Sequence, residues 1–255
     1  MMDLGRRGKD MNANLRLVLM GLVAVAAVSG TVYLYSMTLP LEQHQQLCRN
    51  TPGEAGIEAC TWVVKSDRAG ENDVAEAYTQ RANRYAKLKQ YDRALADLDA
   101  ALRLKPDEVD ALAGRGWIYS ELGQHQRAMQ DLDKVVSLKP NAYTYNLRCW
   151  ARATWGEQLD AALADCNEAL RLKPDYVAAF DSRAFVHYRR GEYGLAVGDA
   201  SGALSINLKL APSRYVRGLA RLREGNEKDG DADIAAAKKL DPKIADEYVG
   251  YGVKP

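Results

Sequence analysis

Hydrophobic positions in the long C-terminal part of the chain follow a helical spacing that restarts at a regular interval. Pro106, Pro140 and Pro174 are evenly spaced at about 34 residues, and Pro242 lies two such intervals further on. Two segments in each period carry apolar residues at spacings of three and four, and a Gly or polar turn separates them. The pattern predicts two amphipathic helices per period and five periods over residues 75–242. We therefore expect an all-α protein.

Small and large side chains also recur at fixed places in each period. In the first two periods these residues are Tyr78, Ala82, Tyr85, Ala94, Leu98, Ala101 and Pro106, then Leu112, Gly116, Tyr119, Ala128, Leu132, Val135 and Pro140. In this pattern the chain resembles the tetratricopeptide repeat family, whose units are helix–turn–helix hairpins of ~34 residues. The resemblance implies a right-handed superhelix, a solenoid that holds proteins or peptides in its concave groove.

Some segments depart from the regular unit. One extra residue enters the turn of the third unit, around "TWGEQL", and the fifth unit has Arg214 and Arg221 where aromatic residues are usual. Residues 42–74 are interpreted as a degenerate leading helical hairpin. Residues 243–255 are expected to form a C-terminal capping helix and tail that covers the apolar face of the last unit.

One arginine and one aspartate recur in every unit. Each Arg precedes its Asp by the same interval, except that the third unit has one extra residue between them. The pairs are Arg81 with Asp97, Arg115 with Asp131, Arg148 with Asp165, Arg183 with Asp199, and Arg217 with Asp233. This matching predicts a structural ladder of bidentate ion pairs between packed helices. The alternative is that the arginines bind an acidic partner.

The four cysteines fall on two helical hairpins. Cys149 takes the small-residue position of Ala82, and Cys166 a large-residue position, so both face the seam between two helices. Helices ~8–10 Å apart bring facing Cα atoms to roughly 4–6 Å, the range of a disulfide. Cys60 aligns with Cys166, and Cys48 lies in the first helix of the leading hairpin. We therefore predict Cys48–Cys60 and Cys149–Cys166 disulfides, with buried free thiols as the alternative.

The N-terminal segment differs from the rest of the chain. Residues 17–41 carry no charged side chain, and several basic residues precede them. A run of ~20 apolar residues is long enough to cross a bilayer, and a basic flank favours the cytoplasm. We expect residues 1–16 to be cytoplasmic, residues 17–41 to be a transmembrane signal-anchor helix, and the repeats to be periplasmic. The alternative is secretion to the periplasm after signal cleavage.

The bacterial inner membrane is the expected location for two further reasons. The closing phrase "YVRGLARLREGNEKDGDADIAAAKKLDP" is similar to those of bacterial repeat proteins of the cell envelope. An even number of cysteines beyond a membrane segment also fits an oxidising compartment.

Charge and motifs exclude several function classes. Lys and Arg number 35 against 34 Asp and Glu, and a net charge of +1 gives no reason to expect nucleic acid. No catalytic or nucleotide-binding motif is recognisable, so we expect no enzyme and no cofactor. His44, His125 and His187 lie far apart, and no cysteine pair has zinc-ligand spacing, so we expect no metal.

The concave groove is the candidate functional surface. The residue two places after each ladder arginine is expected to line it, together with a residue one helical turn further on. The candidate groove residues are Asn83, Trp117, Trp150, Phe185, Tyr188 and Leu219. Aromatic side chains are typical anchors of interfaces, although they can also simply pack neighbouring units.

We therefore expect a membrane-tethered scaffold that binds proteins or peptides. The alternative function is a structural accessory subunit, permanently assembled in an envelope complex such as a secretion or respiratory-complex maturation machine.

Overall fold

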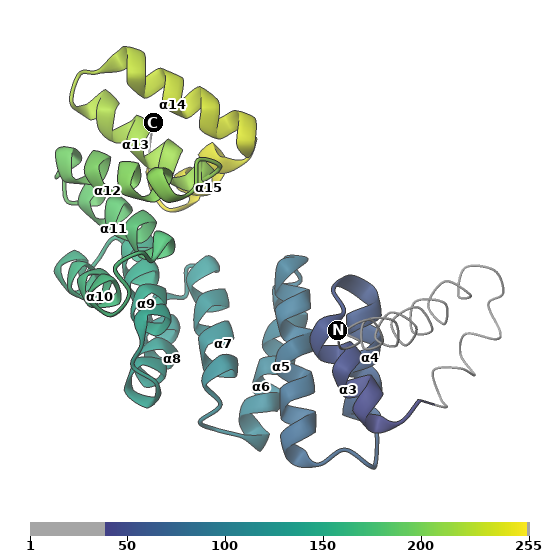
Figure 1. The fold of residues 1–255 in the computed structure, drawn as a ribbon. Coiled ribbons are helices and arrows are strands. Elements are labelled where there is room, and N and C mark those ends of the chain that lie inside the picture. Colours follow the sequence, from purple (N-terminus) through teal and green to yellow (C-terminus); the bar gives the residue numbers. More distant parts are fainter. Residues whose placement is uncertain (1–38, 254–255) are drawn as a thin grey trace, which may run out of the picture.

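The computed structural model describes residues 39–253, and every regular element in that range is a helix (Figure 1). The helices are α3 (Leu41–Asn50), α4 (Gly53–Lys65), α5 (Glu71–Lys87), α6 (Tyr91–Leu104), α7 (Val109–Glu121), α8 (His125–Leu138), α9 (Ala142–Trp155), α10 (Leu159–Leu172), α11 (Val177–Arg189), α12 (Tyr193–Ile206), α13 (Ala211–Arg223), α14 (Glu227–Leu240) and α15 (Ile244–Gly250). The prediction of an all-α fold is confirmed for this range.

The basic segment 1–16 and nearly all of the predicted membrane span 17–41 lie outside the described residues. The last residue of that span, Leu41, is the first residue of α3. Between residues 39 and 253, none of the helices combines the length and the apolar character needed to cross a bilayer.

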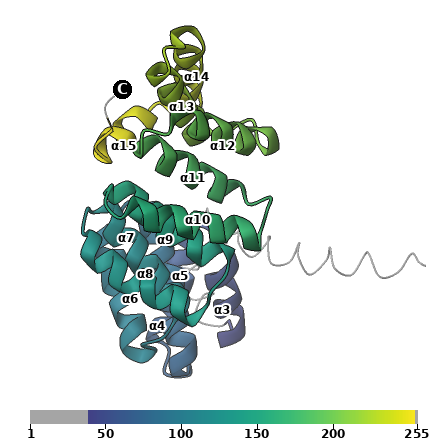
Figure 2. The same ribbon diagram turned by 90° about the vertical axis from the view of Figure 1, so that its left-hand side faces the viewer.

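Consecutive helices pack in pairs, α3 with α4, α5 with α6, and so on to α13 with α14. The first helix of each pair also contacts the first helix of the next pair, from α3 through to α13. The hairpins therefore stack into an arc that runs from α3 to α14, with the short helix α15 on its inner side (Figure 1). Figure 2 shows α15 beside α11 and α13.

Small residues at the helix seams explain the close packing of each pair. Ala82, Ala94 and Ala101 are fully buried between α5 and α6, with Leu98 filling the seam. At Gly116 even a β-carbon would lie 2.8 Å from the Cγ of Leu132, so α7 and α8 can approach this closely only with glycine there.

Two disulfides close two of the hairpins. Cys48 on α3 is bonded to Cys60 on α4 with a Cα–Cα distance of 4.6 Å, and Cys149 on α9 to Cys166 on α10 with 5.5 Å. All four residues are buried. These are the pairs that the sequence predicts, because small and large seam positions face each other directly across a hairpin.

We expect non-reducing peptide mapping of the purified chain to recover only the Cys48–Cys60 and Cys149–Cys166 peptides. The bonded residues are 12 and 17 positions apart, and loops of that length give about 2–3 kcal/mol of stabilisation each. A Cys149→Ala/Cys166→Ala variant should retain the Cys48–Cys60 peptide and lose about that much stability. Free thiols throughout, or a Cys60–Cys149 link, would contradict the pairing.

Candidate functional site

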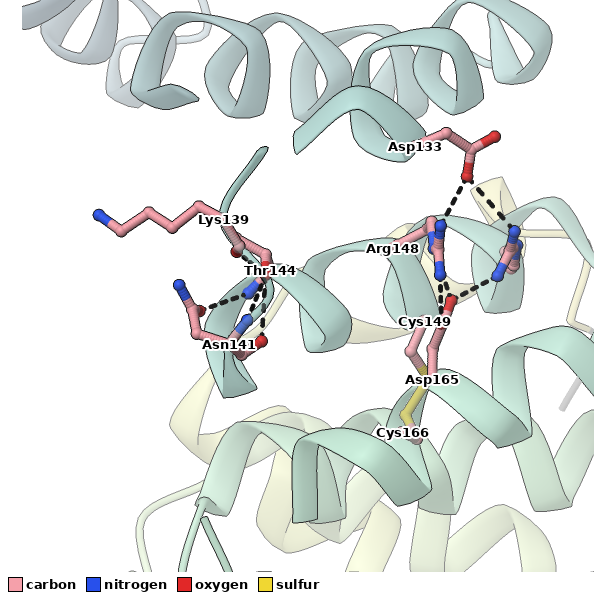
Figure 3. Close-up of polar contacts among 9 residues, drawn as sticks. Asp133, Lys139, Asn141, Thr144, Arg148, Cys149, Asp165 and Cys166 are labelled. Atoms are coloured by element: carbon pink, nitrogen blue, oxygen red, sulfur yellow. Dashed lines mark hydrogen bonds and ion pairs between the residues drawn. A yellow bond between two sulfur atoms is a disulfide. The ribbon is translucent and has the colours of Figure 1, made fainter. Parts of the chain in front are cut away.

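The ladder residues form bidentate pairs in all five units. Arg115 donates from Nε and Nη2 to the two carboxylate oxygens of Asp131, at 2.8 and 2.9 Å. The same two-bond arrangement joins Arg81 to Asp97, Arg148 to Asp165, Arg183 to Asp199 and Arg217 to Asp233. Figure 3 shows the pair at Arg148, next to the Cys149–Cys166 disulfide. Each aspartate thus receives two charge-assisted hydrogen bonds across its helix seam.

The remaining guanidinium nitrogen of each ladder arginine reaches the preceding hairpin. Nη1 of Arg115 bonds Asp99 at 2.7 Å, and Nη1 of Arg148 bonds Asp133 at 2.8 Å. The equivalent bonds in the other units run from Arg81 to Thr61, Arg183 to Asn167 and Arg217 to Ser201. Because the donors are used within the chain, the geometry favours a structural role for the ladder over binding of an acidic partner.

The concave face differs between its two halves. Asn83 on α5 is exposed, and Trp117 on α7 is half-buried with its ring 6.1 Å from that of Tyr91. Trp150 on α9 is also half-buried. Further along, Phe185, Tyr188 and Leu219 are all buried. These last three candidate groove residues are therefore not accessible on the groove surface as the sequence led us to expect.

The C-terminal segment covers that half of the groove. Tyr248 packs edge-on against Phe185 with ring centroids 5.1 Å apart, and Tyr251 packs edge-on against Trp150 at 5.7 Å. Tyr248 also lies 5.0 Å from the ring of Tyr215. Residues 243–255 were expected to cap only the last unit, yet this segment extends over first helices of earlier units.

Polar contacts hold the same segment in place. Nη1 of Arg189 donates to the backbone carbonyl of Tyr251 at 2.5 Å, and the Tyr251 hydroxyl lies 3.5 Å from Oε1 of Glu121. Glu247 lies 3.9 Å from Nζ of Lys89. Burial and then the Glu247 charge raise the pKa of Glu121. The segment therefore contacts residues from the first repeat unit to the fifth.

Gly156, at the end of α9, makes room for Arg189. A β-carbon there would lie 1.8 Å from Nη2 of Arg189, and the residue has a left-handed φ of 80°. Glycine satisfies both requirements at no steric cost. The irregular turn of the third unit thus allows the arginine to reach the C-terminal segment.

Residues 82–147 match the model of the tetratricopeptide repeat family. Among curated proteins, the Homo sapiens protein named "Protein SGT1 homolog" is 30% identical over 94 residues, which are 37% of this chain and 26% of that protein. This chain therefore spans about a quarter of that relative's length.

Several solved structures share the fold, and two of them, TTC0263 and YrrB, are described as tetratricopeptide repeat proteins. TTC0263 from Thermus thermophilus superposes with a TM-score of 0.61 at 23% identity, over 70% of this chain and 97% of that chain. PilW, a type IV pilus biogenesis factor, superposes with a TM-score of 0.60 at 22% identity, over 70% of this chain and 88% of the PilW chain. YrrB, described as having an unusual peptide-binding site, superposes with a TM-score of 0.51 at 19% identity, over 77% of this chain and 100% of the YrrB chain. At these identities the likeness shows the fold alone.

The histidines serve packing or pairing in this repeat structure. His44 stacks on Trp62 with ring centroids 3.7 Å apart, and His125 stacks on Trp155 at 5.4 Å. Nδ1 of His187 lies 2.6 Å from a carboxylate oxygen of Glu192. Within residues 39–253, His, Cys, Asp and Glu side chains form no group of three or more that could hold a metal ion.

A polar group that the sequence reasoning missed lies in the groove under the C-terminal segment. Oδ1 of Asp181 accepts a hydrogen bond from the hydroxyl of Ser213 at 2.7 Å. Although part of the residue is exposed, desolvation of the carboxyl group by burial raises the pKa of Asp181 to about 6, against the opposing effect of Ser213. The sequence could have indicated this group by its position, because Asp181 lies two residues before the ladder arginine Arg183 on a helix that faces the groove.

We expect Asp181→Asn to change the pH dependence of stability. The folded-state pKa of Asp181 is raised above its unfolded value, so its protonation stabilises the fold below about pH 4, and that contribution is lost as pH rises through about 6. The asparagine variant can still accept from Ser213. It should match wild type near pH 4 and exceed it by about 3 kcal/mol at pH 8. Urea unfolding of both proteins across this range checks the prediction, and parallel curves contradict it.

Proposed function

We propose that this protein is a non-enzymatic scaffold that binds proteins or peptides in the concave groove of its repeats. The open half of the groove carries the proposal, because it presents the exposed Asn83 beside the half-buried Trp117 on adjacent first helices. Aromatic side chains such as tryptophan are enriched at protein-interaction surfaces. YrrB, whose fold is similar, is described as having a peptide-binding site, which supports the proposal by analogy.

A photo-crosslinking amino acid at residue 83 tests this proposal. The matched control places the same group at Ala96, which is exposed on the second helix α6. We expect a discrete crosslinked partner from position 83 and none from position 96, and Trp117→Ala should reduce the yield at position 83. Equal crosslinking at both positions contradicts binding in the groove.

We propose further that residues 17–41 tether the repeats to the bacterial inner membrane, with the repeats on the periplasmic side. The charge asymmetry of the N-terminus and the two disulfides support this location. Release into the periplasm after signal cleavage is the alternative. A reporter fused after Pro255 should be active only outside the cytoplasm, and the mass of the mature chain distinguishes tether from cleavage. Activity of a reporter that works only in the cytoplasm contradicts both.

The second candidate is a structural subunit held permanently in an envelope complex, such as a secretion or respiratory-complex maturation machine. The observation that favours it is apolar exposure at the end of α12, since Ile206 and Leu208 are both more than half exposed there and in the turn that follows. Exposed apolar residues in one region often mark an interface. Aggregation of the isolated chain, relieved by Leu208→Asp, favours the subunit, and a stable monomeric chain favours the scaffold.

A further inference from the structure

We propose that residues 244–253 act as an intramolecular ligand of the groove, and that the partner competing for this site is a peptide segment with two aromatic side chains three positions apart. The inference rests on the proposed function, because it names the kind of partner that the groove accepts. The site is the C-terminal half of the concave face, where Tyr248 contacts Phe185 and Tyr251 contacts Trp150. Figure 2 shows the position of α15, the helix that carries Tyr248.

The contacts of the segment are those of a ligand across several repeats. Tyr251 contacts Trp150 of the third unit and lies near Glu121 of the second. Tyr248 contacts Phe185 of the fourth unit and Tyr215 of the fifth. A cap of the last hairpin needs contacts to α13 and α14 alone. The additional contacts follow the groove-facing first helices, which is the path of a bound peptide.

Capping and groove binding fall on different residues of the segment. Ile244 begins α15 and is buried at the end of the solenoid, where α15 contacts α13 and α14. The aromatic contacts to the groove begin at Tyr248, one helical turn later. A helix of seven residues is not stable alone in water, so the part beyond the cap is ordered by docking. In a repeat protein each unit is held by its neighbours, so this part can leave while the hairpins stay folded.

The docked segment leaves buried polar groups unsatisfied. The hydroxyl groups of Tyr215 and Tyr248, whose rings pack against each other, are buried and make no hydrogen bond within the described residues. Such groups raise the free energy of the docked state. The segment is therefore a replaceable occupant, since a peptide that offers a hydrogen bond to the Tyr215 hydroxyl gains what the segment does not supply.

The sequence of the segment specifies the chemistry of the competitor. Trp150 and Phe185 receive the two aromatic rings. Arg189 receives a backbone carbonyl at the second aromatic residue, and Lys89 faces a carboxylate immediately before the first. The expected partner motif is thus acidic–aromatic–x–x–aromatic, the pattern of Glu247 to Tyr251.

A synthetic peptide, IADEYVGYGV, labelled with a fluorophore, tests competition directly against the full chain. Its sequence is that of residues 244–253. Tyr251→Ala removes the ring on Trp150 and weakens the internal segment, so this variant should bind the peptide at least tenfold more tightly than wild type. Tyr248→Phe removes an unsatisfied hydroxyl and strengthens docking, so it should bind at least threefold more weakly. A control peptide, IADEAVGAGV, should bind none of the three.

Two outcomes overturn the inference. In one, wild type and both variants bind the peptide with equal affinity, which shows that the internal segment does not compete. In the other, no form binds the aromatic peptide above the control peptide. If Tyr251→Ala does not fold, the comparison of wild type with the conservative Tyr248→Phe decides. Crosslinking at residue 83 tests partner binding in the half of the groove that the segment does not cover. It can therefore support the proposed function even when this inference fails.

Discussion

We expect Arg115→Ala to lower the free energy of unfolding by about 3–5 kcal/mol, the usual effect of removing one partner from a buried ion pair. Asp131 is 6% exposed and would lose both guanidinium donors at once. The link from Arg115 to Asp99 of the preceding hairpin would be lost as well. The hydrogen bond to Asp131 also raises the pKa of Arg115, which fits a strong pair. Urea unfolding at pH 7 measures the change.

Three further variants make this test specific. Arg103→Ala removes an exposed arginine from α6 and should change stability by no more than about 0.5 kcal/mol. Arg115→Lys should not restore stability, because one ammonium group cannot reproduce the fork. The double variant Arg115→Ala/Asp131→Ala should recover part of the loss, because no buried carboxylate is left unpaired. A loss no larger than that of Arg103→Ala contradicts the structural role.

The repeat period alone predicts contacts that form within one hairpin or between adjacent hairpins. Cys149 and Cys166 could be paired because seam positions repeat at known places on two consecutive helices. The Arg115–Asp131 pair could be recognised for the same reason. The additional bond from each ladder arginine to the preceding hairpin was not predicted, although Asp99 and Asp133 also lie one repeat apart. That spacing was the available signal.

The third, fourth and fifth units show how a departure from the repeat pattern is compensated. Arg221 stands where an aromatic residue is usual, and in the structure its Nη1 bonds the ladder carboxylate of Asp233 at 2.7 Å. Arg152 of the third unit takes the same position and bonds Asp165. In the fourth unit His187 lies 3.6 Å from Asp199. The side chain at this position is therefore coupled to the ladder, which propensity and hydrophobic pattern do not reveal.

The exposure of the concave face could not be predicted, because the C-terminal segment that covers half of it is distant in sequence from the helices it contacts. Tyr251 meets Glu121, 130 residues away, and the short repeat period does not encode such a contact. The amphipathic pattern of α15 predicts that it buries one face, but it does not say against which helices. Phe185 was therefore assigned to an open surface, while the described structure places it beneath two tyrosines.

We expect Phe185→Ala to lower the free energy of unfolding by about 3–5 kcal/mol, as is usual for a large aromatic residue removed from a core. Phe185 is fully buried, and its ring packs against those of Trp150, Tyr248 and Tyr251 at 5.6, 5.1 and 6.3 Å. The cavity would therefore lie where α9, α11 and the C-terminal segment meet, and the helices are too constrained to close it.

Trp117→Ala is the matched comparison for Phe185→Ala, because both residues occupy the same groove position of their units. Trp117 is half-buried and has Tyr91 as its aromatic neighbour, with no tyrosine of the C-terminal segment on it. Its loss should lower stability by only about 1–2 kcal/mol, since much of its surface already faces water. Urea unfolding of the two variants side by side measures the difference. If Phe185→Ala is as mild as Trp117→Ala while partner crosslinking falls, Phe185 is a binding anchor and the C-terminal segment does not cover it in solution.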